Sequence, residues 1–151
     1  MQIQKADKYR NEVVALLTEE KLPVADLPVV LDNFYAAIIN DIVAGAIGLE
    51  IHGAYGLLRS LAVDKAYRNS GIAGTLLAHI EQLAANKKLS EIYLLTETAA
   101  DYFDRKGYQK ISRADVPAEM QQSAEFSYVC PQSAIVMGKS LITVQHKWEI
   151  I

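Results

Sequence analysis

The chain lacks the features that mark secreted, membrane-spanning and metal-binding proteins. It has one cysteine, Cys130, which can form no intrachain disulfide and has no partner at zinc spacing. No apolar run approaches the roughly 18 residues of a membrane span, and the N-terminal stretch has no apolar core of the kind found in signal peptides. We therefore expect a cytoplasmic protein with no membrane partner and no bound metal.

Charge of either sign is modest. The 15 lysines and arginines stand against 18 aspartates and glutamates, which leaves a net charge of −3. This balance argues against non-specific binding to nucleic acid, so we expect no nucleic-acid partner. A hydrophobic fraction of 51% over 151 residues fits a single domain, residues 1–151, with one core.

Hydrophobic periodicity predicts the order β-α-βββ-α-β-α-β-α-β, which is an α+β fold. The predicted strands are residues 2–6, 33–39, 42–51, 54–63, 91–96, 108–112 and 133–141. The predicted helices are residues 7–21, 70–88, 99–106 and 117–126. Asp7 is expected to be the N-cap of the first helix, and two prolines predict a loop at residues 22–30.

Short turns and glycines add detail to this order. The turn dipeptides at residues 40–41 and 52–53 predict an antiparallel meander of three strands. Gly45 and Gly48, inside the middle strand of the meander, predict a bulge or a close approach by another group. Gly107 is expected to end the helix that precedes it.

The most informative stretch runs from residue 57 to residue 76, where a predicted strand leads through a short loop into the longest amphipathic helix. The first turn of a helix has free backbone N–H groups and the positive end of the helix dipole. Gly71, Ala73 and Gly74 keep bulky side chains away from these groups, and Arg68 adds a cation. The pattern favours an anion site of the kind that holds a pyrophosphate. The alternative is a solvated loop whose glycines serve only turn geometry.

The order Arg68-x-x-Gly71-x-Ala73, after a strand that ends Leu-Ala-Val, resembles the acetyl-CoA motif of the GNAT N-acetyltransferase superfamily. The resemblance implies an α/β/α sandwich. Its sheet would be mixed, mostly antiparallel, of about seven strands, with a V-shaped splay between the central parallel strands, residues 58–63 and 91–96, and with flanking helices. It also implies acetyl-CoA as the co-substrate.

The resemblance further assigns roles along this stretch. The pantetheine arm would pair with backbone at Leu61 and Val63, and the pyrophosphate would take N–H groups from Asn69 to Thr75. The acetyl carbonyl would be polarised by backbone N–H near Leu61, which makes this residue a candidate catalytic group. The cofactor-binding residues implied in this way are Leu61, Ala62, Val63, Arg68, Asn69, Ser70, Gly71, Ile72, Ala73, Gly74, Thr75, Thr96 and Phe103.

Two positions depart from the family pattern. Many members carry a tyrosine that protonates the leaving thiolate, four residues before a Gly-aromatic pair that is Gly107-Tyr108 here, and this position holds Phe103. Tyr102 lies about 100° away around the helix. The usual general acid is therefore missing or replaced, with water as an alternative proton donor. Thr96 stands where many relatives have a cofactor-contacting asparagine.

Four short stretches also resemble the arsenic-resistance-associated branch of the superfamily. This similarity implies a small amino-acid-like amine as the acceptor, including arsenic- or phosphorus-containing analogues. A single cysteine is too few for a three-thiolate arsenic cage. The stretches are Gly48-Leu49-Glu50, Leu57-Leu58-Arg59-Ser60, Leu95-Thr96-Glu97-Thr98-Ala99 and Cys130-Pro131-x-Ser133-Ala134.

Transfer to an amine is helped by a base, because amines are mostly protonated at neutral pH. Glu50 is the first candidate, and a solvated carboxylate on an exposed sheet face is the alternative. Glu97, at the end of a buried strand, is the second candidate, and its alternative is a charge that complements the dipole of the next helix. Cys130 is a conceivable covalent acetyl carrier, but a lone cysteine is more often a small core residue.

Arg59 interrupts an apolar strand, which is costly unless its charge is solvated or paired. It is our candidate for holding a substrate carboxylate, with a cross-strand pair to Glu50 as the alternative, and both can hold at once. Ser60, Glu97 and Arg113 complete the predicted substrate-binding residues. Two other functions stay open, a non-catalytic acyl-CoA-binding regulatory module and a protein N-acetyltransferase. Family analogy alone suggests a homodimer.

Overall fold

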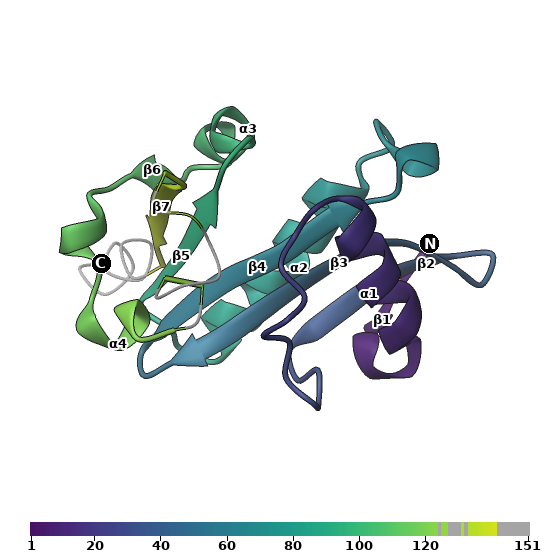
Figure 1. Cartoon of the computed structure of the whole chain (residues 1–151), viewed down its shortest axis with the longest axis horizontal. Coiled ribbons are helices and arrows are strands. Elements are labelled where there is room, and N and C mark those ends of the chain that lie inside the picture. Colours follow the sequence, from purple (N-terminus) through teal and green to yellow (C-terminus); the bar gives the residue numbers. More distant parts are fainter. Residues whose placement is uncertain (124, 127–130, 132, 142–151) are drawn as a thin grey trace, which may run out of the picture. The chain divides into compact units, whose positions relative to one another are not determined.

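The computed structural model describes residues 1–123, 125–126, 131 and 133–141, and the strands among them form one open seven-stranded sheet (Figure 1). The strand order is β1-β2-β3-β4-β5-β7-β6, and the pair β4–β5 is parallel. The predicted α+β fold with a mixed sheet is confirmed. The elements are β1 (Gln2–Lys5), the 3-10 turn η1 (Ala6–Tyr9), α1 (Arg10–Glu19), β2 (Phe34–Ile39), β3 (Ile42–His52), β4 (Tyr55–Val63), η2 (Lys65–Tyr67), α2 (Ile72–Asn86), β5 (Glu91–Thr96), α3 (Ala100–Arg105), β6 (Gln109–Lys110), η3 (Arg113–Asp115), α4 (Ala118–Gln121) and β7 (Ile135–Ser140).

The first of two compact units comprises Met1–Glu50 and Leu58–Leu83. In it, β1 pairs with β2 and β2 with β3, both antiparallel. The turn between β2 and β3 places Asn40 at φ 49° and Asp41 at φ 64°. Two consecutive positive φ angles are what a type I′ hairpin turn requires, so the turn predicted from this dipeptide is confirmed.

The middle strand shows each of the two alternatives predicted for it, a close approach and a bulge. A Cβ atom at Gly48 would lie 2.3 Å from Cε2 of Phe34, so the ring of that buried phenylalanine packs directly against the glycine backbone. The β2–β3 register also shifts, because Ala37 pairs with Gly45 and Ile38 pairs with Val43. The strand β3 therefore carries one extra residue at this point, which is a β-bulge.

Helices cover both faces of the sheet in this unit, with α1 in front of the strands and α2 behind them in Figure 1. On the α1 face, Leu17 is buried in the same cluster as Phe34. On the α2 face, a Cβ atom at Gly45 would lie 3.0 Å from Cγ2 of Ile72. The α/β/α layering implied by the resemblance is thus confirmed for this unit.

The prediction that Asp7 caps the first helix is wrong. Asp7 lies in the 3-10 turn η1, and its carboxylate accepts the backbone N–H of Leu31 at 2.7 Å. The guanidinium of Arg10 donates to the Pro28 carbonyl, also at 2.7 Å. The carboxylate therefore anchors the loop 22–31 to the start of α1, and this long-range hydrogen bond takes the place of a local cap.

The second unit comprises Ile51–Leu57 and the chain from Ala84 onward. In it, the first residues of β4 pair in parallel with β5, from Tyr55 opposite Glu91 to Leu57 opposite Tyr93. The strand β7 pairs antiparallel with both β5 and β6. Burial, and then the neighbouring Glu91 carboxylate, raise the pKa of the Tyr93 phenol above its ordinary value. The core cluster of this unit is Leu57, Tyr93, Val116, Met120, Phe126 and Val136.

The helix α3 ends at the glycine that the sequence indicated. Gly107 has φ +94°, and its N–H bonds to the Asp104 carbonyl at 3.1 Å. The N–H of Tyr108 bonds to the Phe103 carbonyl at 3.0 Å. These two hydrogen bonds form a Schellman motif, in which glycine is the favoured residue.

Two elements of this unit are shorter than predicted. The strand expected at 108–112 comprises only Gln109–Lys110, because the chain turns where the Asp115 N–H bonds to the Ser112 carbonyl at 2.9 Å. The helix expected at 117–126 ends at Gln121, followed by an i→i+3 bond from Ser123 to Met120 at 3.0 Å. Cys130 and residues 142–151 lie outside the described residues. No helix among the described residues is long and apolar enough to cross a membrane.

Candidate functional site

Strand β4 contains a serine in a left-handed backbone conformation. Ser60 has φ +61° and is 8% exposed. This conformation costs a residue with a Cβ about 1–2 kcal/mol, and it persists only where the surrounding structure over-determines it. The hydroxyl Oγ of Ser60 accepts the Nε–H of Arg59 at 3.1 Å. Sequence reasoning missed this feature, because serine gives no signal for a positive φ in a strand.

Beyond Ser60, buried and half-buried side chains alternate to the end of β4. Leu61 and Val63 are half-buried, whereas Ala62 between them is buried in the core under α1. The N–H of Asp64 bonds to the Ala44 carbonyl, at the β3 bulge, at 2.8 Å. The bulge and the end of β4 are therefore joined, and this junction fixes where the loop to α2 begins.

The loop between β4 and α2 is tightly turned. The carboxylate of Asp64 accepts the Ala66 N–H at 2.9 Å and so caps η2. The hydroxyl of Ser70 donates to the Tyr67 carbonyl. Asn69 has φ +65° and Gly71 has φ +81°. Backbone N–H groups in such turns can form an anion-binding concavity. A Cβ atom at Gly71 would meet nothing within 4 Å, so the space beside this backbone is open.

The helix α2 begins with backbone donors that precede its first hydrogen bond. The N–H of Thr75 bonds to the Gly71 carbonyl at 3.1 Å, and the Thr75 hydroxyl donates to the same oxygen at 3.0 Å. In an α-helix, the N–H groups of Ile72, Ala73 and Gly74 then have no carbonyl partner within the helix. Because α2 is 15 residues long, its dipole adds positive potential at this end. The predicted pyrophosphate residues thus share one loop and helix start.

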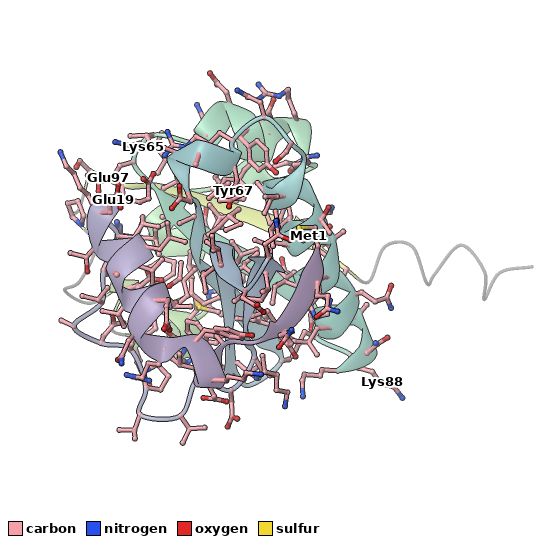
Figure 2. The ribbon with its side chains drawn as sticks, turned by 90° about the vertical axis from the view of Figure 1, so that its right-hand side faces the viewer. Met1, Glu19, Lys65, Tyr67, Lys88 and Glu97 are labelled. Carbon is pink, nitrogen blue, oxygen red and sulfur yellow. The ribbon has the colours of Figure 1, made fainter. Side chains whose placement is uncertain are left out.

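Arg68 already has protein partners. Its Nη2 forms an ion pair with Glu20, and its Nε–H donates to the Val63 carbonyl at 3.4 Å. The Arg68 side chain remains 47% exposed. Figure 2 labels Glu19, at the end of α1, and Lys65 and Tyr67 of η2, which lie at the same end of this unit. An anion bound by Arg68 would share the guanidinium with Glu20, a partner that the sequence did not reveal.

The guanidinium of Arg59 is fully engaged inside the protein. Nη1 donates to Asp26 at 2.5 Å and to Glu50 at 2.6 Å, and Nη2 donates to Asp26 at 2.9 Å and to the Pro23 carbonyl at 3.3 Å. With the bond from Nε to Ser60, all five N–H donors of the arginine have acceptors. The Arg59 side chain has a relative exposure of 0%. The predicted pairing with Glu50 is confirmed, and a role for Arg59 in holding a substrate carboxylate stays a prediction.

Arg59, Asp26 and Glu50 form a cluster of charged side chains, and Glu50 is its most exposed member. Its side chain is 23% exposed, against 7% for Asp26. Glu50 is thus neither a freely solvated surface carboxylate nor a buried one. Asp26 was missed from the sequence, since no local pattern links a residue of the loop 22–31 to Arg59.

In the second unit, two predicted cofactor residues have local partners. The Oγ1 of Thr96 accepts the Ala99 N–H at 2.9 Å, just before α3. Phe103 is 5% exposed, with its ring centroid 5.3 Å from that of Tyr102 and 5.6 Å from that of Tyr108. Both side chains have clear structural roles here, and their contact with a cofactor stays a prediction.

The two predicted substrate residues of the second unit differ in surroundings. Glu97 is exposed at the end of β5. The guanidinium of Arg113 donates to the carbonyl oxygens of Phe126 and Pro131 at 3.3 and 3.2 Å, and it lies 5.6 Å from the Phe126 ring centroid. Arg113 therefore contacts Phe126 and Pro131, and its role toward a substrate stays a prediction.

The strain at Ser60 can be measured by comparing two replacements. Ser60→Gly and Ser60→Ala lose the same hydroxyl, but only glycine adopts a positive φ without strain. We expect Ser60→Gly to be more stable than Ser60→Ala by about 1 kcal/mol in urea unfolding. At Ala62, in ordinary strand conformation, replacement by glycine should instead lower stability by at least about 0.5 kcal/mol. Equal stabilities of the two Ser60 variants would show that the serine is not strained.

Comparison with known proteins places this geometry in a family. A family model described as an acetyltransferase (GNAT) domain matches residues 31–110, just over half of the chain. The Mycobacterium tuberculosis protein Rv2747, crystallised with CoA and NLQ, is 25% identical, with a TM-score of 0.78, over 93% of this chain and 99% of that one. A GNAT-family acetyltransferase from Staphylococcus aureus is 24% identical, with a TM-score of 0.74, over 93% and 98%.

A third structure, the N-acetylglutamate synthase of Neisseria gonorrhoeae with CoA and L-arginine, is 19% identical with a TM-score of 0.77. The alignment covers 93% of this chain but only 33% of that longer protein. A sequence identity of 19% shows a common fold alone. The family match, the parallel β4–β5 pair and the strand order agree with one another. The chain belongs to the GNAT acetyltransferase family.

Proposed function

We propose that this protein transfers the acetyl group of acetyl-CoA to the primary amine of a small molecule, by direct attack in a ternary complex. The observation that carries the proposal is the open start of α2, whose first N–H groups follow the tightly turned loop after β4. Support comes from the family match and from Rv2747, which was crystallised with CoA.

The proposed cofactor site follows the chain from β4 to α2. The pyrophosphate binds the N–H groups from Asn69 to Thr75, where the helix dipole and the small side chains favour an anion. The pantetheine arm takes strand-like hydrogen bonds from Leu61 and Val63. Arg68 adds a positive charge that it shares with Glu20. Contacts of Thr96 and Phe103 with the cofactor are proposed from the family resemblance.

The proposed reaction begins with loss of a proton from the acceptor ammonium to Glu50. The amine nitrogen then attacks the thioester carbonyl, and the oxyanion is stabilised by backbone N–H at Leu61. Collapse of this intermediate breaks the C–S bond and releases CoA thiolate. The nitrogen loses its second proton to water during this collapse. Phe103 carries no acidic proton, so water also protonates the thiolate in this scheme. Positioning of the amine supplies much of the rate enhancement.

A narrower proposal concerns the acceptor. Resemblance of four stretches to the arsenic-resistance-associated branch favours an amino-acid-like amine, including arsenic- or phosphorus-containing analogues. Ser60, Glu97 and Arg113 are the proposed acceptor-side residues. The alternatives are a non-catalytic acyl-CoA-binding module, in line with the missing tyrosine at Phe103, and a protein N-acetyltransferase.

The cofactor site is tested by placing a negative charge at the start of α2. Aspartate at the position of Ala73 suits the first turn of a helix and should not destabilise the fold. The same charge repels a pyrophosphate, so Ala73→Asp should weaken CoA binding at least about tenfold, which corresponds to about 1.4 kcal/mol. The measurement is titration calorimetry with CoA.

Ala73→Asn is the matched control, because it has nearly the same shape without the charge. It should bind CoA within about threefold of the wild type, and the melting temperature of both variants should match or exceed that of the wild type. Unchanged CoA affinity in Ala73→Asp would place the cofactor elsewhere on the chain.

Turnover separates an enzyme from a binding module. The wild-type protein is mixed with acetyl-CoA and a panel of amines, and release of free CoA thiol is followed. The panel contains amino acids, their arsenic- and phosphorus-containing analogues, aliphatic amines and a lysine-containing peptide. We expect thiol release with at least one small amine. CoA binding without release for any amine would favour the non-catalytic module, and release with the peptide alone would favour a protein acetyltransferase.

A further inference from the structure

The donor atoms of Arg59 leave no place for a substrate acid group. Bidentate recognition of a carboxylate uses two parallel N–H donors of the guanidinium. Nη1 and Nη2 already bind the two oxygens of Asp26 in this way, at 2.5 and 2.9 Å. The remaining donors bind Glu50, Ser60 and the Pro23 carbonyl. Asp26 therefore occupies the position that a substrate carboxylate would need.

The segment that carries Asp26 is itself anchored at its far end. Leu31 donates its N–H to Asp7, and the carbonyl of Pro28 accepts from Arg10, both at 2.7 Å. Releasing Asp26 from Arg59 would leave a guanidinium of 0% exposure without its bidentate partner, which is strongly destabilising for a buried charge. Exchange of Asp26 for a substrate acid is therefore disfavoured.

Charge and exposure single out Glu50 as the group that an acceptor meets. Two carboxylates and one guanidinium leave the cluster with one net negative charge. Asp26 and Arg59 have side-chain exposures of 7% and 0%, and Glu50 has 23%. An incoming cationic ammonium thus finds its countercharge at Glu50, whose Oε2 is held 2.6 Å from Arg59 Nη1.

We propose that Arg59 and Asp26 are positioning residues that act through Glu50 and do not contact the acceptor. This inference rests on the proposed function, in which Glu50 takes a proton from the acceptor ammonium. The guanidinium of Arg59 is fixed by its two hydrogen bonds to Asp26 and holds the Glu50 carboxylate through Nη1. Any acid group that the acceptor carries binds elsewhere on the protein.

The proton balance of this step is simple. One proton passes from the ammonium to the Glu50 carboxylate, and the neutral amine then forms the C–N bond. As the C–S bond breaks, the nitrogen gives up its second proton and the departing thiolate takes one up, both through water. Glu50 returns the proton to water after each turnover. Arg59 and Asp26 neither gain nor lose a proton, so their replacement should change turnover without removing a chemical participant.

The experiment measures steady-state kinetics with the full chain, acetyl-CoA and two acceptors found by the thiol-release assay, one with a carboxylate and one without. Asp26→Asn replaces one of the two acceptor oxygens by an NH2 donor, so it cannot pair with Nη1 and Nη2 in parallel and should hold the guanidinium less firmly. We expect it to lower kcat about tenfold, with the KM for each acceptor within about twofold of the wild type. Arg59→Lys keeps the charge but has no planar fork, and it should behave in the same way.

A double-mutant cycle with Glu50→Gln distinguishes positioning from a general structural effect. If Asp26 acts through Glu50, adding Asp26→Asn to Glu50→Gln should lower kcat no further. Asp32→Asn is the matched control, because Asp32 is an exposed aspartate near the same loop, and it should leave kcat unchanged. Melting temperatures are measured throughout, and Arg59→Lys replaces Asp26→Asn in the cycle if the latter unfolds at the assay temperature.

Two results would overturn the positioning role. One is a KM rise of tenfold or more in Arg59→Lys for the acidic acceptor alone, which would mean that Arg59 binds the substrate directly. The other is an undiminished effect of Asp26→Asn in the Glu50→Gln background. A wild type that releases no CoA with any amine contradicts the proposed function and this inference together. A wild type that turns over, with an equally active Asp26→Asn, contradicts this inference alone.

Discussion

The first unit of this protein depends on one buried positive charge. The side chain of Arg59 is removed from water, and a buried charge is tolerated only when it is paired and hydrogen-bonded. Its partners come from three places, namely Glu50 on β3, Asp26 in the loop after α1, and the hydroxyl of Ser60 on β4. Satisfying this single guanidinium therefore brings a proline-bounded loop to the centre of the sheet. The proposed acceptor side of the site is built from the same contacts.

The residue next to Arg59 marks the start of the proposed cofactor side of the site. Ser60, in a left-handed conformation, interrupts β4 and precedes the half-buried residues Leu61 and Val63. A short, tightly turned loop then leads to the start of α2. In the proposed mechanism, one strand thus aligns the thioester and carries the arginine that positions the base. Arg59 and the residues that follow it in β4 thus take part on both the acceptor side and the thioester side of the proposed site. Correct placement of the two reacting groups is what a transfer reaction depends on.

Much of the fold could be predicted from the sequence where the signal is local. The strand β5 has the predicted bounds, Glu91–Thr96, because a buried apolar run lies between polar residues. Gly107 ends α3, and a turn lies at residues 40–41 as predicted, because positive φ angles restrict the choice of residue. The start of α2, with its small residues, was also indicated by local sequence.

The features that escaped prediction depend on tertiary contacts. Asp26 and Arg59 are 33 residues apart, and Glu20 and Arg68 are 48 residues apart, so no local pattern pairs them. The positive φ of Ser60 is imposed by its surroundings and is not a preference of serine. In particular, the sequence does not tell whether the N–H donors of an arginine are all bound within the protein or are open to a substrate. The two cases suggest different roles in the reaction.

Amide hydrogen exchange of the full chain, with and without saturating CoA, decides whether the backbone from β4 to the start of α2 binds acetyl-CoA, because bound phosphate and pantetheine should protect the N–H groups they occupy. We expect slower exchange at residues 61–63 and 69–75, with no change in β1. Saturable CoA binding that leaves these amides unprotected would rule out this binding site.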